Sequence, residues 1–154
     1  MPRQIRRAEC AVSPQRTMEI LHKGDYGVLS TLSADGQPYG VPVNYSFADN
    51  AIYFHCALQG HKLENLAATD RVSFCVVGET EILPDRFAMR YESAIVFGRA
   101  IELTGTEKQY GLSELLKKYS PNYLEAGRRY AKANAGRVRV YKIAIESLSG
   151  KSGR

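Results

Sequence analysis

The sequence lacks the features of secreted and membrane-spanning proteins. It has three cysteines among 154 residues and no Cys-x-x-Cys pair, which favours a reducing compartment over a disulfide-stapled fold. No apolar run approaches the roughly 18 residues of a membrane-spanning helix. The basic start, residues 1–7, is followed by no apolar stretch, so we expect no secretory signal. We therefore expect a cytoplasmic protein without a membrane partner.

Sequence signatures of several functional classes are also missing. Lys and Arg number 21 against 16 Asp and Glu, a net charge of +5, but no zinc finger, RNA-recognition signature or helix-turn-helix accompanies this charge. Nucleic acid is therefore not the expected partner, although a basic regulatory protein stays as an alternative. No P-loop, Gly-x-Gly-x-x-Gly or Gly-x-Ser-x-Gly motif occurs. We predict no catalytic side chain and no bound metal.

The sequence does contain a succession of short strand patterns joined by turns. Strand formers fill six segments: 26–33, 39–47, 51–56, 71–77, 91–103 and 137–146. Helical patterns cover 14–22, 63–67, 107–119 and 121–135, and residues 79–90 predict a loop. Hairpin-length turns join most strands, which favours antiparallel pairing. We expect one domain over 1–154, mainly β (α+β), forming a six-stranded antiparallel barrel with short peripheral helices.

The segment from His55 to Lys62 (HCALQGHK) is the strongest candidate site. It reads as a strand end, a glycine turn and a basic pair at the start of a helix. Free N–H groups at a helix N-terminus, together with His61 and Lys62, suit a phosphate, but an ordinary surface loop gives the same pattern. The spacing of His55, Cys56 and His61 matches no common zinc signature. His55 and Cys56 are adjacent, so they face opposite sides of a strand and form no nucleophilic pair.

The segment from Gly40 to Tyr45 (GVPVNY) is the second candidate. Pro42 and Val43 offer a flat apolar wall, and Asn44 offers both a donor and an acceptor to the edge of a planar heteroaromatic ring. Ordinary core packing around one satisfied asparagine explains the pattern as well, and on the pattern alone it is the more frequent case.

Four runs together resemble one known family: YGVLSTLSADGQPYGVPVNYSF, AIYFHCALQGHKLENL, RVSFCVV and RYESAIVFGRAIEL. In order and spacing they resemble the pyridoxamine 5′-phosphate oxidase-like flavin-binding split barrels, nearest to the nitroimidazole-resistance and nitroimidazole-reductase-like subgroup. The resemblance runs over about residues 14–149. It implies a six-stranded antiparallel split barrel that forms a homodimer, with FMN bound at the dimer interface.

The resemblance also implies which residues bind the cofactor. His61 and Lys62 fall where relatives hold the FMN phosphate, and His55 and Cys56 fall on strand-end positions beside the ribityl chain and phosphate. A second group lies along or near the flavin ring: Val43, Asn44, Ser93 and Thr31.

The function implied by this resemblance is that of an FMN-dependent oxidoreductase. Its expected partner is a small electron acceptor, with nitroaromatics as candidates. The alternative is a protein that binds a flavin, a deazaflavin or haem without turnover of its own. The family's C-terminal substrate segment with Arg and His has no equivalent here, so oxidation of pyridoxamine phosphate is not expected.

Overall fold

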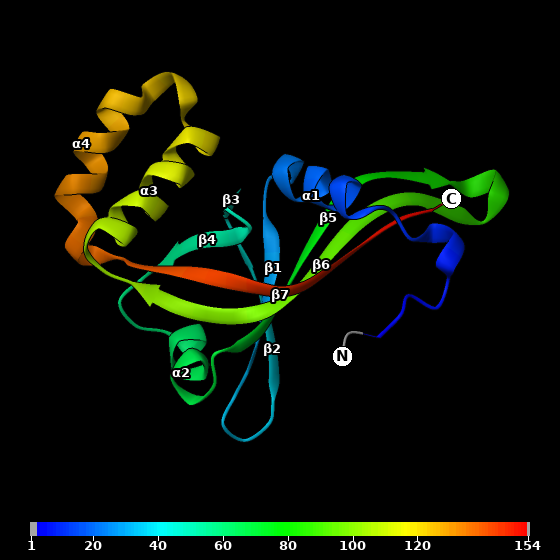
Figure 1. The fold of residues 1–154 in the computed structure, drawn as a ribbon, viewed down its shortest axis with the longest axis horizontal. Helices are drawn as coiled ribbons and strands as arrows, with labels where there is room; N and C mark the ends of the chain where they lie inside the picture. Colours follow the sequence, from blue (N-terminus) through cyan, green and yellow to red (C-terminus); the bar gives the residue numbers. More distant parts are fainter. Residues whose placement is uncertain (1–2, 154) are drawn as a thin grey trace.

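The computed structural model describes residues 3–153, and its centre is one seven-stranded sheet (Figure 1). The spatial order is β2-β1-β5-β6-β7-β4-β3, and every neighbouring pair is antiparallel. The predicted class, a mainly antiparallel fold with peripheral helices, is confirmed. The strands are β1 (Gly27–Leu32), β2 (Pro38–Val43), β3 (Ser46–Ala48), β4 (Ala51–Cys56), β5 (Arg71–Leu83), β6 (Ala88–Leu103) and β7 (Arg139–Gly153).

The seventh strand arises because the predicted strand 39–47 is divided. β2 ends at Val43 and pairs with β1, whereas β3 begins at Ser46 and pairs with β4 at the opposite edge of the sheet. Only Asn44 and Tyr45 join these two edge strands. Two residues span no more than about 10 Å between the flanking positions, so the sheet must curl until its edges approach. This link is what gives the sheet its barrel shape.

The prediction of a loop over residues 79–90 is wrong. After a register shift between Val77 and Thr80, β5 and β6 stay paired up to Leu83 and Ala88, and a short 3-10 turn (Pro84–Arg86) joins them. Most side chains of this arm are exposed, so the sequence shows no alternation of buried and exposed positions. β7 also continues along the arm to Gly153, beyond the predicted end at residue 146.

The main core fills the inside of the curled sheet. Six of the strands and helix α1 (Pro14–Lys23) contribute to it. Ser13 caps α1, because its hydroxyl accepts a hydrogen bond from the Arg16 N–H at 3.1 Å. The largest core side chains without solvent contact include Tyr45, Phe54, Phe74, Leu21 and Leu29.

Two longer helices form a hairpin against the outside of the barrel. Helices α3 (Gly105–Tyr119) and α4 (Leu124–Asn134) lie over the β4 end of the sheet, apart from the shorter α2 (His61–Ala68) (Figure 1). Leu112 of α3 packs on a second buried cluster formed by Ala51, Tyr53, Leu103 and Val140. No helix within residues 3–153 is long and apolar enough to cross a bilayer.

The last residue of α3 fastens the hairpin to the barrel. The Tyr119 hydroxyl donates to the Asp25 carbonyl at 2.6 Å and accepts from the backbone N–H of Tyr45 at 2.9 Å. Asp25 precedes β1, and Tyr45 belongs to the link between β2 and β3. One hydroxyl therefore joins three segments whose positions differ by up to 94 residues.

We predict that Tyr119→Phe lowers the free energy of unfolding by about 1–3 kcal/mol, because it leaves the N–H of the fully buried Tyr45 without its partner. Tyr123→Phe is the matched control, since Tyr123 is 72% exposed. Urea unfolding followed by circular dichroism measures both variants. Equal stability of the two variants would show that the hydrogen bonds of the Tyr119 hydroxyl do not stabilise the fold.

Candidate functional site

Four of the predicted site residues line a single cavity, which we call the β2–β4 groove. Its volume is about 640 Å³, and Val43, Asn44, His55 and Lys62 share it with Tyr26 and Pro42. β2 supplies the apolar wall, the β2–β3 link supplies Asn44, β4 supplies His55, and α2 supplies Lys62. The fold thus joins the two candidate segments of the sequence, which are separate along the chain.

The Lys62 end of the groove is built from a strand, a tight loop and a helix start. Gly60 stands immediately before α2 with φ at 147°, a backbone conformation that glycine adopts without strain. Gly60 offers no side chain to cap the helix, so the first N–H groups of α2 lack a capping partner there. Together with the Lys62 ammonium, they give this end of the groove a positive potential.

His61, the other member of the basic pair, turns away from the groove. Its Nε2 lies 3.1 Å from the Ser33 hydroxyl, and its ring packs on Tyr39 with 4.1 Å between ring centroids. Both partners come from the β1–β2 hairpin. His61 therefore ties α2 to this hairpin, and Lys62 is the member of the pair that lines the groove.

His55 has an electrostatic environment that favours its neutral form. Partial burial lowers the pKa of His55, and the neighbouring positive charge of Lys62 lowers it further. At pH 7 the imidazole is accordingly neutral, with one nitrogen as donor and the other as acceptor. The groove thus presents one cation and two neutral polar groups, Lys62 beside His55 and Asn44.

The other predicted residues lie outside the groove. Cys56 is buried in the main core, and burial raises the pKa of its thiol. Thr31 is also buried, and its hydroxyl accepts a hydrogen bond from the Asn65 amide at 2.9 Å. Ser93 lies on β6, where it pairs with Val77 of β5 and with Lys151 of β7. In the described part of the chain, no group of three or more His, Cys, Asp or Glu residues is placed to hold a metal ion.

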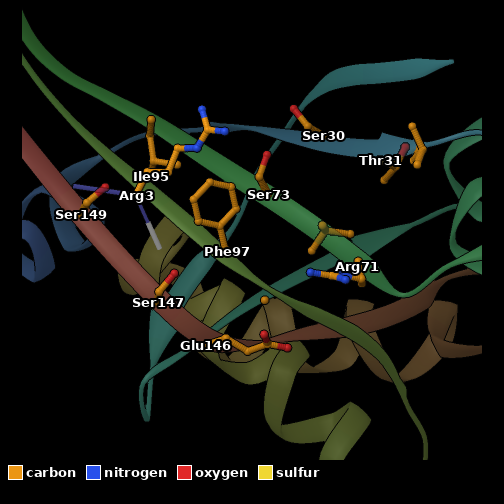
Figure 2. A pocket seen from close by; sticks show the side chains of 13 residues that line it. Arg3, Ser30, Thr31, Arg71, Ser73, Ile95, Phe97, Glu146, Ser147 and Ser149 are labelled. Atoms are coloured by element: carbon orange, nitrogen blue, oxygen red, sulfur yellow. The ribbon is translucent and has the colours of Figure 1, made fainter. Parts of the chain in front are cut away.

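The sequence analysis missed two features, Tyr26 and a second cavity on the outer sheet face. Tyr26 precedes β1, is 60% exposed and lines the groove. The second cavity, the sheet-face cavity, has a volume of about 760 Å³ and is lined by residues of β1, β5, β6 and β7 together with Arg3. Figure 2 shows Phe97 at its centre, beside Ser73 and Ile95. Tyr26 and Phe97 fall inside the predicted strands 26–33 and 91–103, and the sequence does not show that their side chains are exposed.

A family model supports the resemblance on which the site residues were assigned. Residues 13–152 match the model described as pyridoxamine 5′-phosphate oxidase. The chain belongs to this family. The family includes oxidoreductases. No match to the chain is found among curated proteins.

Solved structures share the fold over most of the chain. A FAD-binding protein from Mesorhizobium loti is 28% identical, with 94% of this chain and 97% of that chain covered and a TM-score of 0.68. A candidate 5-nitroimidazole antibiotic resistance protein from Bacteroides thetaiotaomicron is 23% identical, with coverages of 92% and 86% and a TM-score of 0.77. A FAD and haem binding protein from Mycobacterium smegmatis is 18% identical, with coverages of 92% and 72% and a TM-score of 0.75.

We predict that Lys62→Gln raises the pKa of His55. Removing a neighbouring positive charge makes protonation of the imidazole less unfavourable, so the pKa moves up towards its ordinary value while the effect of burial remains. The chain has three histidines, which makes assignment by NMR titration of the ring protons straightforward. Lys23→Gln removes an exposed charge on α1 and serves as the control. An unchanged His55 pKa in Lys62→Gln would show that the two groups are not coupled.

Proposed function

We propose that this chain binds FMN in the β2–β4 groove and acts as an oxidoreductase on a small acceptor. The observation that carries the proposal is the shared groove, where an apolar wall, a polar amide and a lysine at a helix start meet. Its volume of about 640 Å³ lies within the range of roughly 300–1,000 Å³ typical of cofactor and ligand sites. Membership of the pyridoxamine 5′-phosphate oxidase family and the likeness to a FAD-binding protein support the same cofactor class.

Four residues of the groove have a defined part in this proposal. Lys62 and the N–H groups at the start of α2 neutralise the phosphate. Pro42 and Val43 pack against the flat ring, and Asn44 orients its polar edge through one donor and one acceptor. When bound, FMN supplies the redox chemistry, and the protein supplies binding, orientation and electrostatics. The groove therefore needs no acid–base side chain.

Lys62→Ala tests the placement of the phosphate. Because a charge-assisted hydrogen bond contributes about 1.5–3 kcal/mol, we expect FMN affinity to fall by at least tenfold. Riboflavin, which has no phosphate, should bind wild type and Lys62→Ala equally, and Lys23→Ala should leave both affinities unchanged. Quenching of flavin fluorescence on titration measures all six combinations. If riboflavin and FMN weakened alike in Lys62→Ala, the phosphate would not lie at this lysine.

The alternative is a carrier that binds a flavin, a deazaflavin or haem without turnover. The likeness to a FAD and haem binding protein keeps this alternative open. The absorbance spectrum of the purified protein identifies the cofactor. Reoxidation of the chemically reduced holoprotein by a nitroaromatic or a quinone under anaerobic conditions then separates an oxidoreductase from a carrier.

We also propose that two copies of the chain associate through the outer sheet face. Leu32, Ile95 and Phe97 line the sheet-face cavity and are 42%, 38% and 50% exposed. Large apolar side chains gathered on one exposed sheet face are characteristic of protein interfaces. Ser93 lies on the same side of β6, two residues before Ile95, and would therefore belong to that interface.

Phe97→Glu tests this association. A carboxylate at the centre of the face cannot be buried without a partner, so the variant should elute as a monomer where wild type elutes as a dimer. Tyr123→Glu places the same charge on an exposed aromatic position between α3 and α4 and should not change the oligomeric state. Size-exclusion chromatography with light scattering gives the mass. A monomeric wild type would refute the proposed dimer.

A further inference from the structure

The hairpin of α3 and α4 borders a third cavity, which is open on one side and which we call the helical cavity. Its volume is about 480 Å³, and it lies between the hairpin and the part of the chain that carries Asn44, His55 and Val138. Closely packed interiors leave few spaces much larger than a water molecule. A cavity of this size has instead the dimensions of a small-molecule site.

The cavity exists because α4 does not reach the core. None of the residues of α4 is buried, whereas Leu115 of α3 is. The two helices approach one another closely at Gly127, where a Cβ would come within 2.7 Å of the Leu116 side chain. Leu112, Leu116 and Ala131 are half-buried and line the cavity. Its body is accordingly apolar.

The polar groups that line the helical cavity favour a ligand with a negative charge. Arg137 carries the one formal charge among the described residues that line it, and no carboxylate is present there. Arg137 makes no ion pair with a carboxylate of residues 3–153. A guanidinium without a protein partner, at the rim of an apolar cavity, matches a planar carboxylate. A cationic occupant would meet repulsion and find no counter-charge.

Asn44 and His55 line both the helical cavity and the β2–β4 groove. The two spaces therefore meet at these side chains. A ligand in the helical cavity would extend from Arg137 along the leucines towards the polar end of the groove. Asn44 is the residue proposed to orient the polar edge of the flavin ring, so this position adjoins the ring if the groove holds FMN as proposed.

We infer that the helical cavity is the binding site of the electron acceptor and that it selects aromatic carboxylates that carry a nitro group, which is the group reduced. The carboxylate binds to Arg137, the ring lies among Leu112, Leu116 and Val138, and the opposite end of the ligand faces His55. This inference rests on the proposed function for the role of the ligand as an acceptor. The binding itself depends only on residues of the helical cavity.

Titration with 4-nitrobenzoate tests the inference, with the neutral isostere 4-nitrobenzamide as the matched ligand. Binding to the purified protein is followed by calorimetry and by NMR shifts of the His55 ring protons, with and without added FMN. Arg137→Gln should lower the affinity for 4-nitrobenzoate by about tenfold or more and leave the affinity for 4-nitrobenzamide unchanged, because only the carboxylate loses a charge-assisted bond. Lys132→Gln removes an exposed cation of α4 that does not line the cavity, and it should affect neither ligand.

Ala131→Trp tests the location independently of charge. Ala131 lies on α4, which contributes no buried residue, so the large ring should fill the cavity without disturbing the core. Both ligands should then lose binding while the melting temperature stays at the wild-type value. Wild-type affinity in Ala131→Trp, or an equal loss of both ligands in Arg137→Gln, would overturn the inference.

These variants and titrations distinguish a failure of this inference from a failure of the proposed function. Lys62→Ala should bind FMN at least tenfold more weakly and still bind 4-nitrobenzoate, because Lys62 does not line the helical cavity. If wild type bound no FMN, the proposed function would fail. The titrations of the flavin-free protein would still show whether the helical cavity binds 4-nitrobenzoate. If FMN bound and 4-nitrobenzoate did not, the inference alone would fail.

Discussion

The hydrogen bonds of the Tyr119 hydroxyl hold together the part of the molecule on which both proposed sites depend. They join the end of α3 to Asp25 and to Tyr45. Tyr26 and Asn44, the neighbours of these two residues in the chain, line the β2–β4 groove, and Tyr119 itself lines the helical cavity. The groove and the helical cavity therefore share a wall fixed by one side chain. A movement of α3 would change both spaces together.

The same contact region carries an energetic cost. The Lys118 ammonium is buried 3.6 Å from the centre of the Tyr45 ring and has no hydrogen-bond partner among the described residues. Burial lowers the pKa of Lys118 to about 8, and the negative charge of Asp25 opposes part of this shift. The cation–π contact offsets some of the lost hydration. This arrangement persists because Tyr119, the next residue, fixes the backbone of α3 at this point.

Local patterns predicted much of the fold, and long-range contacts account for what they missed. The helical pattern beginning at residue 14 marked the start of α1, and runs of strand-forming residues marked β4 and most of β5. The arm at 79–90 was missed because its exposed faces leave no pattern. The basic pair beside Gly60 was visible in the sequence, but only the structure shows Lys62 lining the groove and His61 bound to Ser33. No local pattern indicates that Asn44 and His55 line the same groove, since this arrangement depends on the curl of the whole sheet.

The position of His55 between the groove and the helical cavity couples their electrostatics. Burial lowers the pKa of His55, and Lys62 lowers it further because a protonated imidazole would lie close to a second cation. An anion bound at Lys62 offsets this charge and so favours protonation of His55. A protonated His55 would present a second positive charge to the helical cavity, in addition to Arg137. By linkage, an anion in either space would favour the same protonation state of His55, so the proposed phosphate and the inferred carboxylate would stabilise each other's binding through this single imidazole.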